Sequence, residues 1–477
     1  MASILRSVTP LKRVPIQRGT LPTILLFFVF TTIYAFLLKW YGPIPAAGGM
    51  LILFMFCATL IYIEVGLVGL IFSMLFSPEI SLGQVAVRAI TLRFEDFLIL
   101  VVFFAWMIRL AIRKEERRFR PANIYLPIAV FLLIGLISTI RGASLGLIDL
   151  PSGLMYFFKI FEFFMIFVFT FQYIDNLKKV KILFILMLFT ALCLSLWNIL
   201  LVPTTEVWTI SRITTPFEGA SPEPSTYGGF FTIVLGLTAA LIYHAPTRRI
   251  RIWLFVFFGI MFIPFMYTLS RTSYVSFLAV VLALIIMKRN YKLLAVVLIV
   301  LVLSPVIFPE KVFDRIMYTF TDRIKAFGIF DRSFGERLFV WRKVWWNLIH
   351  RPILGGGLTK DSIIDGYYAR ILIETGLSGF AAFWWLMISI FRTASRTYKA
   401  MTIWWTQGLL LGFILGVIGL LVHAFSAITF YIVRIMEPFW FCTGMIYAIS
   451  YLVAVDASSN EQNIQTETVS AEDTVPV

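Results

Sequence analysis

The chain has 477 residues, of which 60% are hydrophobic and only 14% are charged. A water-soluble globular protein carries roughly 25% charged residues. This composition therefore excludes that class of protein. The formal net charge of +15 does not indicate nucleic-acid binding, because the lysines and arginines lie in short loops between apolar blocks, as they do in membrane proteins.

Apolar blocks follow one another along the chain, and most have about 18–22 residues, the length of a helix that crosses a bilayer. They are continuously apolar, as in Leu293–Leu303, whereas the strands of a membrane barrel alternate apolar and polar residues. We therefore predict an all-α polytopic membrane protein with about 14 transmembrane helices. The predicted spans are 21–39, 45–62, 64–77, 94–111, 124–140, 153–172, 181–201, 226–244, 251–268, 271–287, 291–308, 367–391, 403–424 and 428–454.

Basic segments between the spans predict which side of the membrane each loop faces. They occur in the N-terminal segment and near 109–120, 178–181, 248–251, 288–292 and 392–399. All of them fall on one side only if 45–77 contributes two short spans. Because lysine and arginine favour cytoplasmic loops, this side is predicted to be the cytoplasm, and both termini lie there. We expect this membrane to be the inner (plasma) membrane.

The domain organisation follows from these spans. We predict a cytoplasmic segment 1–20, about 11 spans in 21–308, an external loop 309–366, three further spans in 367–454, and a disordered cytoplasmic tail 455–477. The stretch Leu21–Leu38 is interpreted as an uncleaved first helix, because it is long for a signal peptide. The tail is polar and lacks aromatic residues, which is typical of disorder.

Two long connections, 203–225 and 309–366, are predicted on the external side. Loops of such length are usually functional. The longer loop is predicted to carry two short helices. Apolar residues recur at helical spacing in the first, 311–327, while the second, 335–349, is rich in tryptophan and ends before Pro352.

Arginines are the leading candidates for chemistry, because ionisable groups near membrane level often mark functional sites. Arg212 lies in the first long connection, Arg271 at the outer end of a span, and Arg337 and Arg342 on the second loop helix. Arginine stays charged and binds phosphate through two parallel hydrogen bonds. The set therefore suits a lipid-linked phosphate or pyrophosphate, although interfacial snorkelling or solvation in a loop would also explain each residue.

Acidic residues accompany these arginines. Glu223 lies in the first connection, and Asp365 and Glu374 flank the start of a later span, where Asp365 could also serve as a helix cap. Arg434 and Glu437 are three residues apart on one face of the last span, which predicts a structural ion pair as an alternative to substrate contact. The histidines and cysteines are scattered and form no metal-binding motif, so no metal or other cofactor is predicted.

Three motifs resemble one known family. SRTSYV at 270–275, GERLFVWRKVWWNLIHRPILGGG at 335–357 and DGYYARILIETGLSG at 365–379 occur in the order and spacing of the O-antigen ligase and polymerase superfamily. The earlier connection with Arg212 and Glu223 is similar to that family too. The resemblance covers roughly residues 205–450. The part of the chain before them indicates only the membrane topology.

The resemblance implies a C-type membrane glycosyltransferase architecture. Such enzymes transfer glycans from undecaprenyl-pyrophosphate carriers on the external leaflet, without a metal or a nucleotide sugar. Ligases transfer the glycan to lipid A core, and polymerases transfer it to the next lipid-linked repeat unit. The ligase pattern has histidine where this chain has Asp365 and asparagine where it has Gly366, so the resemblance favours a polymerase for O-antigen, capsular polysaccharide or exopolysaccharide.

The same resemblance implies roles for the candidate residues. Arg271 and Arg212 would stabilise the charge that develops on the pyrophosphate leaving group, and Asp365 would orient or deprotonate the acceptor hydroxyl. The predicted substrate-binding residues are Arg337, Arg342, Glu223, Tyr368 and Arg434. Undecaprenyl-pyrophosphate-linked oligosaccharide would be both donor and acceptor, and a chain-length regulator stays open as a further partner.

Two other classes of protein also fit the span pattern. A flippase for lipid-linked oligosaccharide, or another transporter, has a similar number of spans, although the sequence lacks the two-half symmetry that transporters often show. A non-enzymatic partner in an export complex is the second alternative. Its charged residues would tolerate single substitutions.

Overall fold

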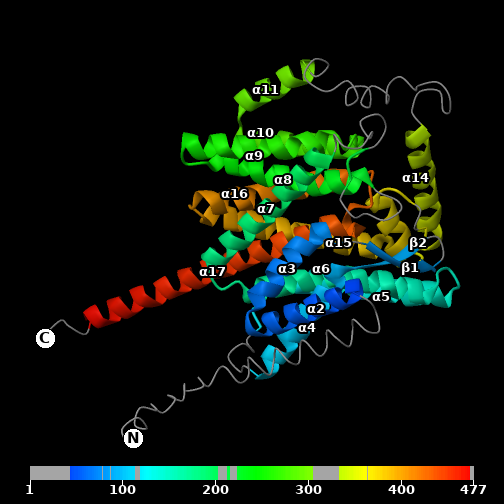
Figure 1. Cartoon of the computed structure of the whole chain (residues 1–477), viewed down its shortest axis with the longest axis horizontal. Coiled ribbons are helices and arrows are strands. Elements are labelled where there is room, and N and C mark those ends of the chain that lie inside the picture. Colours follow the sequence, from blue (N-terminus) through cyan, green and yellow to red (C-terminus); the bar gives the residue numbers. More distant parts are fainter. Residues whose placement is uncertain are drawn as a thin grey trace, which may run out of the picture.

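The computed structural model describes residues 43–77, 79–85, 88–112, 119–201, 212–214, 223–303, 332–361 and 364–472. Within these ranges the chain is a bundle of α-helices (Figure 1). Nine of the described helices are long and apolar enough to cross a membrane. They are α5 (Tyr125–Ser144), α6 (Leu150–Tyr173), α7 (Leu177–Leu201), α8 (Pro224–His244), α9 (Arg248–Met266), α10 (Arg271–Lys288), α15 (Tyr367–Ala400), α16 (Trp404–His423) and α17 (Val433–Glu472).

The remaining helices complete the described fold. They are α2 (Pro43–Ile61), α3 (Ile63–Phe76), α4 (Phe94–Ile112), α11 (Tyr291–Val302), α14 (Arg332–His350) and the 3-10 helix η3 (Thr429–Tyr431). Each predicted span from 45–62 onward coincides with a described helix, and α14 confirms the second helix of the long loop. The predicted span 21–39 and loop helix 311–327 lie outside the described residues.

Two features differ from the sequence prediction. A β-hairpin of β1 (Glu79–Val85) and β2 (Arg88–Arg93) joins α3 to α4, so the fold is not purely α-helical. In addition, α17 continues to Glu472, through residues predicted to be a disordered tail. Residues 456–472 contain neither proline nor glycine, and extending an existing helix costs much less than starting a new one.

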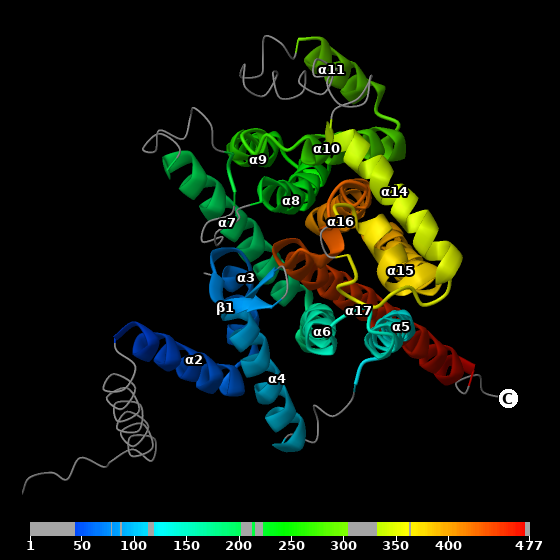
Figure 2. The ribbon, with the colours of Figure 1, turned by 90° about the vertical axis from the view of Figure 1, so that its right-hand side faces the viewer.

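One end of the bundle collects the amino-terminal ends of α4, α6, α8, α10, α15 and α17. Figure 1 shows the hairpin and α14 at this end, while the carboxyl end of α17 projects from the opposite one. Figure 2 looks onto this end, where α14 lies alongside α15. We call it the α14 end. By the alternation of spans, it is the end predicted to face the exterior.

Helices α8 and α16 pack closely at the centre of the bundle. The side of α16 that faces α8 carries glycines at 408, 412, 416 and 419, and small residues at such spacing let membrane helices approach closely. A Cβ atom added at Gly412 would lie 2.4 Å from the Cα of Leu237 and 3.0 Å from the carbonyl oxygen of Gly236. Both neighbours are backbone atoms of α8, so neither can move aside alone.

We therefore expect Gly412→Val to separate α8 from α16 and to cost at least about 1–3 kcal/mol through overpacking. The measurement is the apparent melting temperature of the detergent-purified protein. Gly259→Val on α9 is the matched control, because a Cβ added at Gly259 would meet no described atom within 4 Å apart from the adjacent residues and the backbone of its own helix. Equal melting temperatures for the two variants would contradict the close packing.

Candidate functional site

The long helix α15 is interrupted at Gly376, whose φ is 68° and ψ is −161°. This combination belongs almost entirely to glycine. The interruption leaves a short helical segment, Tyr367–Thr375, at the α14 end. It also deprives the backbone groups on both sides of Gly376 of their helical partners, and buried groups of this kind need new ones.

The glycine-rich segment Pro352–Gly357 supplies these partners. The N–H groups of Gly356 and Gly357 donate to the carbonyls of Ile373 and Glu374, each at 2.8 Å. In return, the carbonyl of Pro352 accepts the N–H of Leu377 at 2.8 Å. The break in α15 is therefore stabilised by the motif that precedes the helix in the sequence.

The short segment carries a buried ion pair. Nε of Arg370 donates to Oε1 of Glu374 at 2.8 Å, and both side chains are fully buried. The same oxygen accepts the N–H of Thr359 at 3.1 Å, and Oε2 accepts the hydroxyl of Tyr431 at 2.6 Å. Both carboxylate oxygens of Glu374 are thus occupied, which holds Arg370 in a fixed position.

Two aromatic rings also contact the Arg370 guanidinium. Its central carbon lies 4.5 Å from the ring centroid of Tyr431 on η3 and 5.1 Å from that of Tyr156 on α6. Such contacts stabilise a cation that has left water. The terminal nitrogens Nη1 and Nη2 have no hydrogen-bond partner within the described part of the chain.

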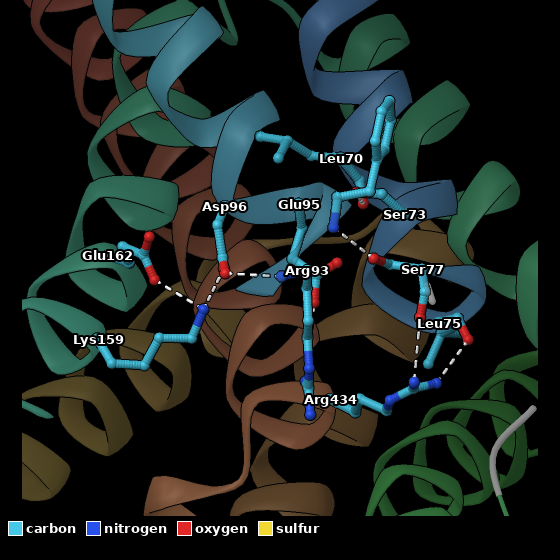
Figure 3. Close-up of polar contacts among 11 residues, drawn as sticks. Leu70, Ser73, Leu75, Ser77, Arg93, Glu95, Asp96, Lys159, Glu162 and Arg434 are labelled. Carbon is cyan, nitrogen blue, oxygen red and sulfur yellow. Dashed lines mark hydrogen bonds and ion pairs between the residues drawn. The ribbon is translucent and has the colours of Figure 1, made fainter. Parts of the chain in front are cut away.

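A second group of charges lies one helical turn from Tyr156, between α4 and α6 (Figure 3). Lys159 pairs with Asp96 and, at 2.9 Å, with Glu162. Asp96 also accepts the backbone N–H of Arg93 at 3.0 Å, and this bond ties the hairpin to α4. These partly buried ion pairs compensate the charges that α4 and α6 bring to the membrane level of the α14 end.

Two residues predicted to bind substrate have structural contacts. Arg434 is buried and donates to the carbonyls of Leu75 at 2.9 Å and Ser77 at 3.1 Å, so it caps the carboxyl end of α3 (Figure 3). The hydroxyl of Tyr368 donates to the carbonyl of Leu421 at 2.8 Å. These contacts favour structural roles over the predicted contact with substrate.

The remaining predicted residues with described side chains lie at the α14 end. Arg271 is the first residue of α10, after the capping residue Ser270. Arg212 lies beside the turn before α10, because the N–H of Ile213 donates to the carbonyl of Tyr267 at 3.1 Å. Asp365 and Glu223 are exposed at the starts of α15 and α8.

The loop helix α14 carries the last two predicted residues. Its buried side packs on α15, where the side-chain amide of Asn347 donates to the carbonyl of Ile373 at 2.9 Å. Arg342 is exposed on another side of this helix. Arg337 lies in the same helix, but its side chain is outside the described residues.

His423, at the carboxyl end of α16, connects the starts of α10 and α15. Its Nε2 lies 3.4 Å from Oγ of Ser273 on α10, and its Nδ1 lies 2.8 Å from Oγ1 of Thr429. The carbonyl of the next residue, Ala424, accepts the N–H of Tyr367 at 2.9 Å. The segments that contain Arg271 and Arg370 therefore meet at the end of α16.

In chemical terms, the α14 end offers cations that can bind an anion and carboxylates that can accept a proton. Sequence reasoning did not identify Arg370, Tyr156, Tyr431 or His423 as site residues. Among the described residues, no group of three or more His, Cys, Asp or Glu side chains could hold a metal ion.

Fold and site together define a polytopic membrane protein with a charged site at one end of its helix bundle. A family model described as O-Antigen ligase matches residues 256–384. The predicted resemblance to the O-antigen ligase and polymerase superfamily is therefore confirmed over this segment. The matched segment includes Arg271 and the Arg370–Glu374 pair. A search of curated proteins finds no match.

Proposed function

We propose that this protein is a C-type glycosyltransferase that polymerises lipid-linked oligosaccharides on the external leaflet of a bacterial inner membrane. The observation that carries the proposal is the family match over 256–384, whose segments bring Arg271 and the Arg370–Glu374 pair to one end of the bundle. Charged residues at the α14 end suit a substrate that combines a lipid, a pyrophosphate and a glycan.

In the proposed reaction, an acceptor hydroxyl oxygen attacks the anomeric carbon of the donor sugar. The carbon–oxygen bond to the pyrophosphate breaks, and its electron pair leaves with undecaprenyl pyrophosphate. Arg271 and Arg212 stabilise the negative charge of this leaving group. Asp365 orients the acceptor hydroxyl and takes its proton. Pyrophosphate is a good leaving group, so positioning contributes much of the rate.

The choice of polymerase over ligase rests on Asp365, which occupies the position of histidine in the ligase pattern. A ligase that transfers the finished glycan to lipid A core is the second candidate, because the matching family model is described as O-Antigen ligase. The two activities use the same donor and differ in the acceptor. The products in a deletion strain therefore distinguish them.

We expect Arg271→Ala to lower polymer formation at least about 100-fold, because it removes charge stabilisation from the leaving group. The measurement is complementation of a deletion strain, with polysaccharide length and undecaprenyl-linked intermediates analysed at equal protein levels. Arg249→Ala is the matched control, because Arg249 is an exposed arginine at the amino end of α9, which the span order assigns to the opposite membrane side.

If the protein is a polymerase, the deletion strain will accumulate single repeat units. Complementation with the wild type or with Arg249→Ala will restore long polymer. Normal polymer from Arg271→Ala would overturn the assigned role of Arg271. Long polymer that stays on the carrier in the deletion strain would identify a ligase. Repeat units confined to the cytoplasmic leaflet would identify a flippase and contradict the proposed function.

A further inference from the structure

The guanidinium of Arg370 can donate more hydrogen bonds than its described contacts account for. Its side chain is fully buried, yet only Nε has a hydrogen-bond partner, and Nη1 and Nη2 have none within the described residues. Buried polar groups in folded proteins are nearly always hydrogen-bonded. An arginine cannot resolve this by losing its proton, because it stays charged under all ordinary conditions.

Neutralising Glu374 does not explain the choice of arginine. A lysine would supply the same charge to the carboxylate, whereas arginine adds two more donor nitrogens in a rigid plane. Thr359 and Tyr431 complete the hydrogen bonds of Glu374, so its carboxylate fixes one edge of the guanidinium. The Tyr156 and Tyr431 rings contact it as well. The edge formed by Nη1 and Nη2 is therefore preorganised, and it carries no hydrogen bond within the described residues.

Two parallel N–H groups match the spacing of two oxygens in a phosphate or carboxylate. On the basis of the proposed function, we propose that the Nη1 and Nη2 edge of Arg370 binds an oxyanion of the substrate, namely the pyrophosphate of the lipid-linked donor. A carboxylate of an acidic sugar has the same chemistry and is the alternative source. Arg370 then acts at the same end of the bundle as Arg271, from a segment that the end of α16 connects to α10.

Binding requires a neighbouring segment to move, because Arg370 is not exposed. The segment next to the pair is already in a costly conformation. Thr359, whose N–H bonds to Glu374, has a φ of 73°, and Asp361 has a φ of 59°. Positive φ is uncommon outside glycine and is costly for a β-branched residue such as threonine. We assign the opening to this segment.

The test uses the full-length protein in lipid nanodiscs and measures binding of undecaprenyl pyrophosphate, with undecaprenol as the uncharged lipid probe and glucuronate as the carboxylate probe. Two variants address Arg370. The double variant Arg370→Gln with Glu374→Gln removes both charges and keeps an amide pair in their place. Arg370→Lys keeps the charge and removes the planar edge. Arg120→Gln is the control, because Arg120 has partners in the carbonyls of Phe171 and Ile174.

We expect wild type and Arg120→Gln to bind undecaprenyl pyrophosphate much more tightly than undecaprenol. The double variant should bind undecaprenyl pyrophosphate at least about 10-fold more weakly, and its undecaprenol binding should be unchanged. Arg370→Lys should also lose affinity, because an ammonium binds phosphate only as a point charge. A loss confined to glucuronate would assign the site to an acidic sugar and overturn the pyrophosphate assignment.

Wild-type affinity for undecaprenyl pyrophosphate in either folded Arg370 variant would overturn the proposal. If the double variant does not fold, the binding measurement on Arg370→Lys alone tests the proposal. This variant keeps a cation beside Glu374, so the carboxylate is not left buried without a counterion. Failure of the wild-type protein to bind undecaprenyl pyrophosphate would instead count against the proposed function. The two failures are therefore distinguishable.

Discussion

Gly376→Ala should prevent accumulation of folded protein. The backbone at Gly376, with φ 68° and ψ −161°, lies in a region essentially confined to glycine. A Cβ atom there would also lie 2.4 Å from the carbonyl oxygen of Ile353 and 2.8 Å from that of Pro352. Those carbonyls accept the N–H groups of Ser378 and Leu377, so moving them would break the hydrogen bonds that stabilise the interrupted helix.

The expected effect combines about 1–3 kcal/mol of backbone strain with the cost of this clash. Size-exclusion chromatography of a fluorescent fusion in detergent measures the fraction of folded protein. Gly259→Ala is the control, because Gly259 lies within α9 and the added Cβ would meet no described atom within 4 Å apart from the adjacent residues and the backbone of its own helix. A wild-type profile for Gly376→Ala would show that α15 is not interrupted at this residue.

Helix positions could be predicted from the sequence because each apolar block is long and continuous enough to specify a helix by itself. The interruption of α15 at Gly376 could not be predicted from the sequence. It depends on hydrogen bonds between Pro352–Gly357 and residues on both sides of Gly376, and their pairing is a tertiary contact without sequence periodicity. The hairpin between α3 and α4 was missed because it lies between the apolar blocks, and the prediction was built on those blocks alone.

The candidate site was predictable where a motif or an isolated charge marked it. Arg271 and Asp365 were identified in this way, and both lie at the α14 end. Arg370 was missed, although its position four residues before Glu374 is the spacing of a helical ion pair. Tyr156 and Tyr431 carry no such signal, because tyrosines are common at membrane interfaces. Only the packing of α6 and η3 brings them to Arg370.

Glu374→Gln should destabilise the protein by about 3–5 kcal/mol, because it leaves the Arg370 charge buried without its counterion. Arg370→Gln should cost less. The remaining carboxylate keeps the hydrogen bonds from Tyr431 and Thr359, whereas the guanidinium in Glu374→Gln keeps no charged partner. The double variant should be more stable than Glu374→Gln, because neither charge remains buried. Apparent melting temperatures in detergent measure the order of the three variants.

The order of the melting temperatures distinguishes the contribution of the ion pair to stability from that of the other contacts of Glu374. Tyr431 and Thr359 bond to the carboxylate in the wild type, and both contacts change equally in Glu374→Gln and in the double variant. If these contacts were the main source of stability, the two variants would melt at the same temperature. A double variant that melts higher than Glu374→Gln assigns the loss to the uncompensated charge of Arg370. The buried charge of Arg370 would then be what Glu374 stabilises in the folded protein.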